Sequence, residues 1–85
     1  PNPFNPTTTI EFAITDASSP RVSLTVYDLL GRNVKRMVNE ALPGGSYRVQ
    51  WDGTDNSGAD ANSGIYYYVL QAGDRKMAKK MTLIR

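Results

Sequence analysis

Three aspartates in one polar segment come nearest, by type and spacing, to a chemical site. Asp52, Asp55 and Asp60 lie in a stretch rich in glycine, serine and asparagine. Carboxylates and carbonyls are the oxygen ligands that calcium prefers. The spacing does not fit an EF-hand, because counting from Asp52 places Ser57 at the glycine position and Ser63 at the glutamate position. A looser calcium site is the alternative to a loop of turns that the aspartates close through their own backbone.

The sequence lacks the side chains that most catalytic sites use. It contains no histidine and no cysteine, which removes the commonest general base near neutral pH, thiol nucleophiles, zinc fingers and disulfides. Nothing directs a lysine toward a serine, as a Ser–Lys nucleophile would need. Asp52 and Asp55 are close enough for a glycosidase pair, but both lie in turn-forming sequence. We therefore expect no enzymatic activity and no cofactor, with calcium as the single alternative.

Basic residues gather near the C-terminal end, although the net charge is only +2. No acid follows Asp74, whereas half of the ten basic residues do: Arg75, Lys76, Lys79, Lys80 and Arg85. A basic strand of this kind suits an anionic partner or surface. The alternative is an edge strand whose lysines prevent pairing with other sheets.

Aromatic residues raise two further kinds of surface. Tyr66, Tyr67 and Tyr68 lie near the basic strand, as in a nucleic-acid site. Consecutive strand residues point to alternate faces, so at most two share a surface, and we expect no nucleic-acid partner. Carbohydrate binding would need aligned exposed aromatics, for which the candidates are Tyr27, Tyr47, Trp51, Tyr66 and Tyr68. Most of these alternate with core positions, so we expect them in the core, with glycan binding as an alternative.

Short alternating segments separated by turn signals predict the elements that position these residues. Strands are expected over residues 9–14, 22–27, 33–39, 46–51, 65–70 and 75–84. A seventh short strand is expected within residues 1–8 or 53–62. Gly31 supplies a positive φ in the connection before the third strand. In that strand Met37 lies opposite Val34 and Val38, which a β-bulge would reconcile.

These elements predict one all-β domain over residues 1–85, an immunoglobulin-like β-sandwich of about seven short antiparallel strands without a disulfide. Residues 65–70 are apolar or aromatic at every position, which indicates a central strand covered on both sides. Trp51 is the expected core anchor. No run of 18 apolar residues is present, so we expect no transmembrane segment.

Five short motifs follow one another in a fixed order along the chain. They are Pro1-Asn2-Pro3-Phe4, Tyr27-Asp28 with Gly31-Arg32, Trp51-Asp52-Gly53, Ser63-Gly64-Ile65-Tyr66, and Lys80-Met81 with Leu83 and Arg85. Over all 85 residues this series resembles the type A C-terminal sorting domain of type IX secretion cargo. That domain is similar to the immunoglobulin-like domain of flagellar hook-capping proteins.

The resemblance implies delivery rather than chemistry. Such a domain follows an N-terminal cargo domain in a larger secreted protein, and the type IX machinery recognises it in the periplasm of a Gram-negative bacterium. The cargo then reaches the medium or the cell surface. The candidate partner-recognition residues are Gly64, Tyr66, Lys79 and Lys80, with turn and core roles as the alternative for the first two. An immunoglobulin-like accessory module, either a spacer or a glycan binder, is the alternative function.

Overall fold

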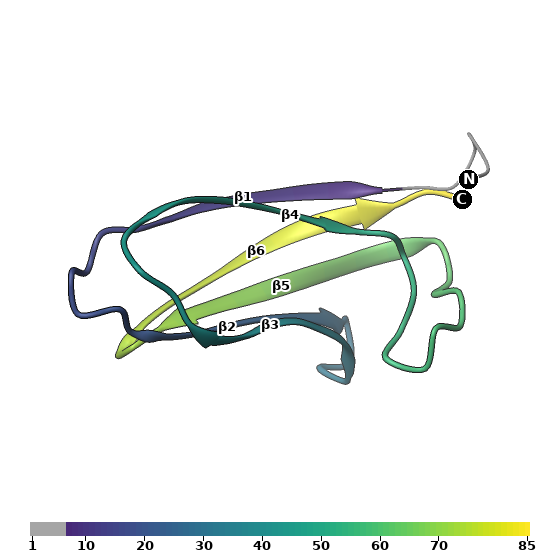
Figure 1. Cartoon of the computed structure of the whole chain (residues 1–85). Coiled ribbons are helices and arrows are strands. Elements are labelled where there is room, and N and C mark those ends of the chain that lie inside the picture. Colours follow the sequence, from purple (N-terminus) through teal and green to yellow (C-terminus); the bar gives the residue numbers. More distant parts are fainter. Residues whose placement is uncertain (1–6) are drawn as a thin grey trace.

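The computed structural model describes residues 7–85, which form two antiparallel sheets (Figure 1). The larger sheet has the strand order β3-β2-β5-β6, and the smaller sheet pairs β1 with β4. The six strands are β1 (Thr8–Ile14), β2 (Arg21–Asp28), β3 (Asn33–Ala41), β4 (Gly45–Trp51), β5 (Gly64–Ala72) and β6 (Arg75–Leu83). This all-β arrangement confirms the predicted sandwich. None of the described residues belongs to a helix long and apolar enough to cross a membrane.

The described part of the chain contains six strands where the sequence predicts about seven. Residues 53–62 form only an isolated bridge between Thr54 and Asp60. Gly53 and Gly58 have φ values of 78° and 88°, which turn the backbone away from the extended conformation. The other expected position, residues 1–8, lies largely outside the described residues, and β1 begins at Thr8.

The predicted irregularity of β3 is a β-bulge. Leu24 of β2 pairs with Val38, and Thr25 pairs with Arg36, so Met37 is the extra residue between them. Met37 and Val38 are neighbours in sequence, yet both pack against the core. A bulge permits this because it interrupts the alternation of side chains between the two faces. The blurred apolar pattern of this strand is thereby explained.

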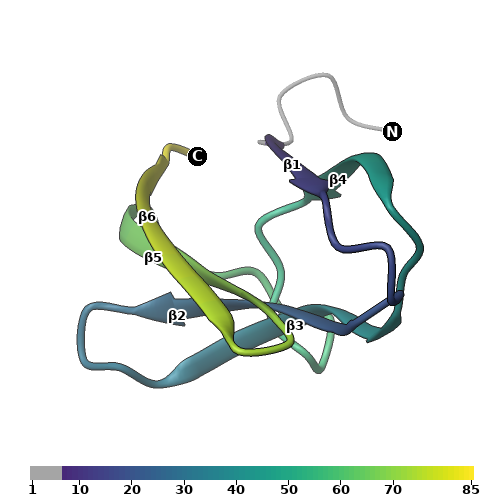
Figure 2. The same ribbon diagram turned by 90° about the vertical axis from the view of Figure 1, so that its left-hand side faces the viewer.

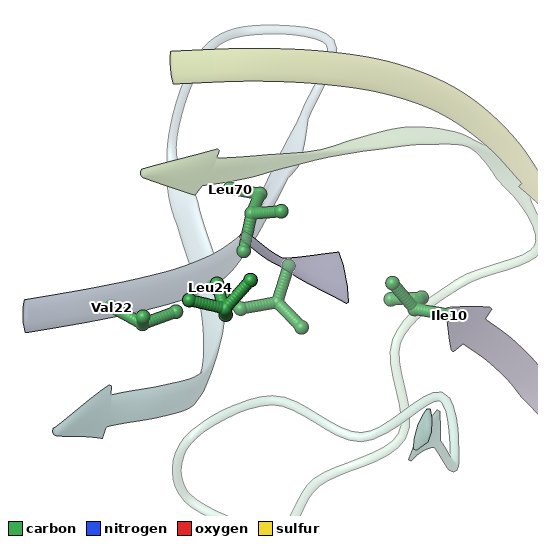
Figure 3. Close-up of a cluster of buried hydrophobic side chains, with 5 residues drawn as sticks. Ile10, Val22, Leu24 and Leu70 are labelled. Atoms are coloured by element: carbon green, nitrogen blue, oxygen red, sulfur yellow. The ribbon is translucent and has the colours of Figure 1, made fainter. Parts of the chain in front are cut away.

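The first of two core clusters joins β1 to the larger sheet. Ile10 and Ile14 of β1 pack with Val22 and Leu24 of β2 and Leu70 of β5, and all five side chains are buried. Figure 3 shows Val22, Leu24 and Leu70 of the larger sheet lying together, with Ile10 across from them. Each such side chain contributes about 1.5–3 kcal/mol by leaving water. The alternation in residues 9–14 thus identified the correct face.

The second cluster is built on Trp51, which is 0% exposed. Its indole lies edge-on to Tyr66, with ring centroids 5.2 Å apart, and Leu83 of β6 packs in the same cluster. The Trp51 Nε1–H donates a hydrogen bond to the Thr54 carbonyl at 2.9 Å. The Tyr66 hydroxyl donates to the Asn62 carbonyl at 2.6 Å, as in the tyrosine corner of immunoglobulin folds. The prediction that Trp51 anchors the core is confirmed.

β5 is central in its sheet but is not covered on both faces. It lies between β2 and β6, and Tyr66 and Leu70 are buried on its inner face. On the outer face Tyr67 and Val69 are half-buried, and Ile65 is 41% exposed. Within residues 7–85 both sheets are accounted for, and neither lies over this outer face. The prediction of a strand covered on both sides is therefore wrong for the outer face.

The smaller sheet covers only part of the larger one, which leaves β6 open. β6 is an edge strand, which the lysine-rich sequence offered as one of two alternatives, and Figure 2 shows it standing apart from the β1–β4 pair. Its inner-face residues are those that pair with Leu70, Tyr68, Tyr66 and Gly64 of β5, and they are Met77, Lys79, Met81 and Leu83. Leu83 is buried, Met81 is half-buried and Met77 is 48% exposed. Solvent exposure therefore increases along β6 with distance from the Trp51 cluster.

Replacing Tyr66 by phenylalanine tests the corner hydrogen bond. Tyr66→Phe keeps the ring in the core but leaves the Asn62 carbonyl without its donor, so we expect the free energy of unfolding to fall by about 1 kcal/mol. Urea denaturation measures the change. The matched control is Tyr27→Phe, which removes a hydroxyl from a half-buried ring on the outer face and should leave stability nearly unchanged. Equal effects of the two substitutions would contradict a structural role for the corner.

Candidate functional site

The aspartates of the calcium hypothesis close turns and hold ion pairs. The Asp52 Oδ1 atom accepts hydrogen bonds from the Thr54 amide at 3.1 Å and the Thr54 hydroxyl at 2.6 Å, and the hydroxyl bond is the main cause of the lowered pKa of Asp52. Asp55 closes a second turn in the same way. Asp60 lies 3.5 Å from the Arg85 guanidinium. In the part of the chain that the structure describes, no three metal-ligating side chains are grouped to hold an ion.

Arg85 fastens the loop between β4 and β5 from one side. Its backbone N–H donates to the Ser63 hydroxyl at 3.0 Å, and its Nε–H donates to the Ala61 carbonyl at 2.6 Å. The guanidinium also donates to the Gly53 carbonyl and pairs with Asp60. A Cβ atom at Gly53 would lie 2.8 Å from this guanidinium. Glycine at position 53 of the Trp-Asp-Gly motif therefore serves both the turn and the close approach of Arg85.

The same loop is fastened from the other side by β3. The Asn56 amide donates to the Val34 carbonyl at 2.9 Å, and the Asn56 side-chain oxygen accepts from the Arg36 amide at 2.9 Å. The Asn56 side-chain nitrogen donates to the Asn33 side chain at 3.2 Å. Residues 52–63 thus join β3, β4 and β6 at one end of the sandwich. The polar side chains of this loop form hydrogen bonds with backbone groups that need partners, and this accounts for the polar composition that suggested calcium.

The Tyr-Asp-x-x-Gly-Arg motif builds the neighbouring β2–β3 turn. The Asp28 Oδ1 atom accepts from the Leu30 and Arg32 amides at 2.9 and 3.0 Å, and Oδ2 accepts from the Arg32 guanidinium at 2.8 Å. These hydrogen bonds, the backbone one from Arg32 above all, lower the pKa of Asp28. Gly31 has a φ of 80°, which confirms the positive φ expected there. Leu29 and Leu30 are left 64% and 78% exposed at the tip.

The structure separates the four candidate recognition residues. The Tyr66 ring is in the core, and its hydroxyl closes the corner. Gly64, Lys79 and Lys80 are exposed, and Gly64 opens β5 opposite Leu83. Lys79 and Lys80 follow each other on β6 and pair with Tyr68 and Tyr67, so one lies on each face of the edge strand. Lys79 and Lys80 are therefore the two members of the set that present a side chain to solvent.

β6 presents an open positive edge. It pairs with β5 alone among the strands of residues 7–85, so the backbone groups on its other side have no sheet partner there. The three ion pairs within the described residues do not include Lys76, Lys79 or Lys80. A strand from another chain can add to such an edge through main-chain hydrogen bonds, and the lysines would favour a partner with acidic side chains.

Tyr67 was missed as a surface residue by the sequence reasoning. It pairs with Tyr27 across β5 and β2, and the two rings lie on the outer face with centroids 5.8 Å apart and planes 25° apart. Alternation with Val26 could have placed Tyr27 on this face. The face of Tyr67 depends on how β5 pairs, because all its neighbours are apolar or aromatic.

The other aromatic candidates for glycan binding pack in the core or at its rim. Trp51 and Tyr66 are buried, and Tyr68 packs against both core clusters. Tyr47 stacks on Phe12 at 5.3 Å between ring centroids, and its hydroxyl donates to the Pro43 carbonyl at 2.5 Å. Of the five candidates, Tyr27 alone belongs to an outward-facing aromatic pair.

Substituting Arg85 tests whether it fastens the loop. Arg85→Ala removes the Nε and guanidinium contacts, so we expect the free energy of unfolding to fall by about 1.5–3 kcal/mol, as for hydrogen bonds to a charged group. Arg85→Lys should recover only part of this, because an ammonium cannot reproduce the fork of donors. Urea denaturation measures both. Arg36→Ala is the control because its side chain is exposed, and an equal loss there would contradict the role given to Arg85.

Comparisons with known proteins agree with this architecture. Neither the curated proteins nor the solved structures gave a match. The family model described as the FlgD Ig-like domain matches residues 3–76. The match contains β1 to β5 but ends near the start of β6, so Leu83 of the second core cluster, Lys79, Lys80 and Arg85 lie beyond it. Because well over half of the chain is matched, this protein belongs to the FlgD Ig-like domain family.

Proposed function

We propose that this domain is a non-catalytic sorting module that directs an attached cargo protein through the outer membrane by the type IX secretion system. Its partners would be the machinery of that system and an N-terminal cargo domain in the same chain. The path would lead from the periplasm of a Gram-negative bacterium to the medium or the cell surface. The observation that carries the proposal is the open, positively charged edge of β6.

Four of the five sorting-domain motifs build one end of the sandwich and lead into this edge, whereas the first, Pro1-Asn2-Pro3-Phe4, lies outside the described residues. Asp28 and Gly31 shape the β2–β3 turn, and Trp51 and Tyr66 belong to the second core cluster. Arg85 holds the loop between β4 and β5 in place. The motifs thus act together in holding β6 and its flanking loop in one conformation. A rigid edge can be recognised as a folded surface, because little conformational freedom is lost on binding.

β6 also differs from an edge strand that merely resists aggregation. Three successive positions of its inner face are Met77, which is 48% exposed, then Lys79, and then the half-buried Met81. An added strand would cover this apolar surface and extend the sheet by main-chain hydrogen bonds. The two lysines would then select partners that carry acidic residues at matching positions.

An export assay tests the proposal. We expect residues 1–85, fused to a periplasm-directed fluorescent protein, to carry it to the medium or surface of a bacterium that has the type IX system. Export should disappear in a translocon-deficient strain. The double substitution Lys79→Glu and Lys80→Glu should reduce export, because it reverses the charge of the recognised edge.

Two controls make the result specific. Arg36→Glu on β3, the opposite edge of the same sheet, should leave export unchanged. Thermal melting must show that the Lys79→Glu/Lys80→Glu domain stays folded. If the folded wild-type fusion remains periplasmic in both strains, the sorting function is contradicted. If the folded double variant is exported normally, β6 is not the recognised surface.

A further inference from the structure

We propose that the outer face of the larger sheet holds a binding site for an anionic saccharide, built on the Tyr27–Tyr67 pair. The face has a shallow depression of about 310 Å³ lined by residues of β2, β5 and β6. Thr25, Val69 and Lys76 line it beside the two rings. Tyr27 and Gly31 also belong to a sorting motif, but Ser23, Thr25, Tyr67, Val69, Gln71 and Lys76 belong to none, so most of this lining is not explained by the sorting function.

The two tyrosines give the depression an aromatic wall. Their rings are 25° from parallel with centroids 5.8 Å apart, and both side chains are half-buried although neither sheet of residues 7–85 covers them. A Cβ atom at Gly31 would lie 3.9 Å from the Tyr67 hydroxyl, so the β2–β3 turn borders that end of the wall. Tyrosine offers an apolar ring for the C–H face of a sugar and a hydroxyl for hydrogen bonding.

The floor of the depression suits a ligand rich in hydroxyl groups. Ser23, Thr25 and Gln71 line it together with the tyrosines, and their side chains can both donate and accept hydrogen bonds. A few polar groups beside an apolar wall are the usual composition of a small-ligand site. The volume of about 310 Å³ is at the lower limit of such sites, which fits one or two sugar rings rather than a long chain.

The charge of this face determines the class of sugar. Lys80 pairs with Tyr67 and Lys76 pairs with Gln71 across β5 and β6, so both ammonium groups flank the aromatic wall. The outward positions of β2, β5 and β6 include no acidic residue. A saccharide that carries carboxylate or phosphate groups complements this field, and a neutral one does not.

A single-stranded nucleic acid fits the same face less well. Successive bases need a series of stacking rings along a basic groove. This face has one aromatic row, because Tyr66 and Tyr68 point to the core on the other side. The hydrogen-bonding floor next to the pair instead matches the hydroxyl groups of a sugar.

Calorimetric titration of the 85-residue domain tests the site. We expect a short oligogalacturonate to bind, with weaker binding at higher salt, and a neutral galactan oligosaccharide of the same length to bind at least about tenfold more weakly. Tyr67→Ala should weaken oligogalacturonate binding about tenfold or more by removing half of the wall. Lys76→Gln should weaken it severalfold, whereas Arg48→Gln, which removes a charge from the smaller sheet, should not.

Each other outcome overturns the proposal. Absence of oligogalacturonate binding, equal binding of the neutral sugar, or tighter binding of oligothymidylate would do so. Equal binding of inorganic phosphate would show an anion site without sugar recognition. If the Tyr67→Ala variant bound oligogalacturonate as tightly as the wild type, the aromatic wall would not be part of the site. Melting curves and the Lys76→Gln variant exclude loss of folding as the cause of weaker binding. Because the domain is titrated alone, the result does not depend on whether it directs export.

Discussion

The burial of Trp51 is the interaction on which the rest of this structure depends. An 85-residue chain without disulfides has a small core, and here one indole is the largest fully buried side chain. It contacts Tyr66, whose hydroxyl closes the corner before β5, and its own N–H holds the start of the following loop. The loop is then in place to receive Arg85 and the Asn56 contacts to β3. The conformation of the loop therefore depends on the packing of Trp51 in the core.

The inequality of the two sheets is the second constraint. A two-stranded sheet cannot cover a four-stranded one, so β1 and β4 bury the centre of the larger sheet's inner face and leave β6 exposed, while neither sheet of residues 7–85 lies over the outer face. These are the surfaces that carry exposed lysines, exposed Met77 and the Tyr27–Tyr67 pair. Both proposals place binding at these surfaces. The first proposal follows from this asymmetry, and the second from the uncovered outer face.

Local sequence patterns predicted the elements better than their environment. Alternation identified the strands, the inward face of residues 9–14 and the anchor Trp51, because each depends on a period of two or on turn chemistry. The bulge at Met37 was also visible as a broken alternation. By contrast, the outer exposure of β5 and the pairing of Tyr67 with Tyr27 depend on which strands are neighbours. The contacts of Arg85 with residues 53–63 join segments distant in sequence, and no local pattern contains them. The turn-forming sequence around Asp52 and Asp55 already predicted turns, and the structure adds which hydrogen bonds these two carboxylates accept.

The open edge of β6 is the central claim, and amide hydrogen exchange along this strand tests it most directly. In the 85-residue domain, every second amide of β6 should be protected by its hydrogen bond to β5, and the intervening amides should exchange nearly as fast as exposed backbone. β2, which has partners on both sides, should be protected throughout and serves as the internal reference. Uniform protection along β6 would show that another segment or a second copy already covers the edge, and would contradict the account.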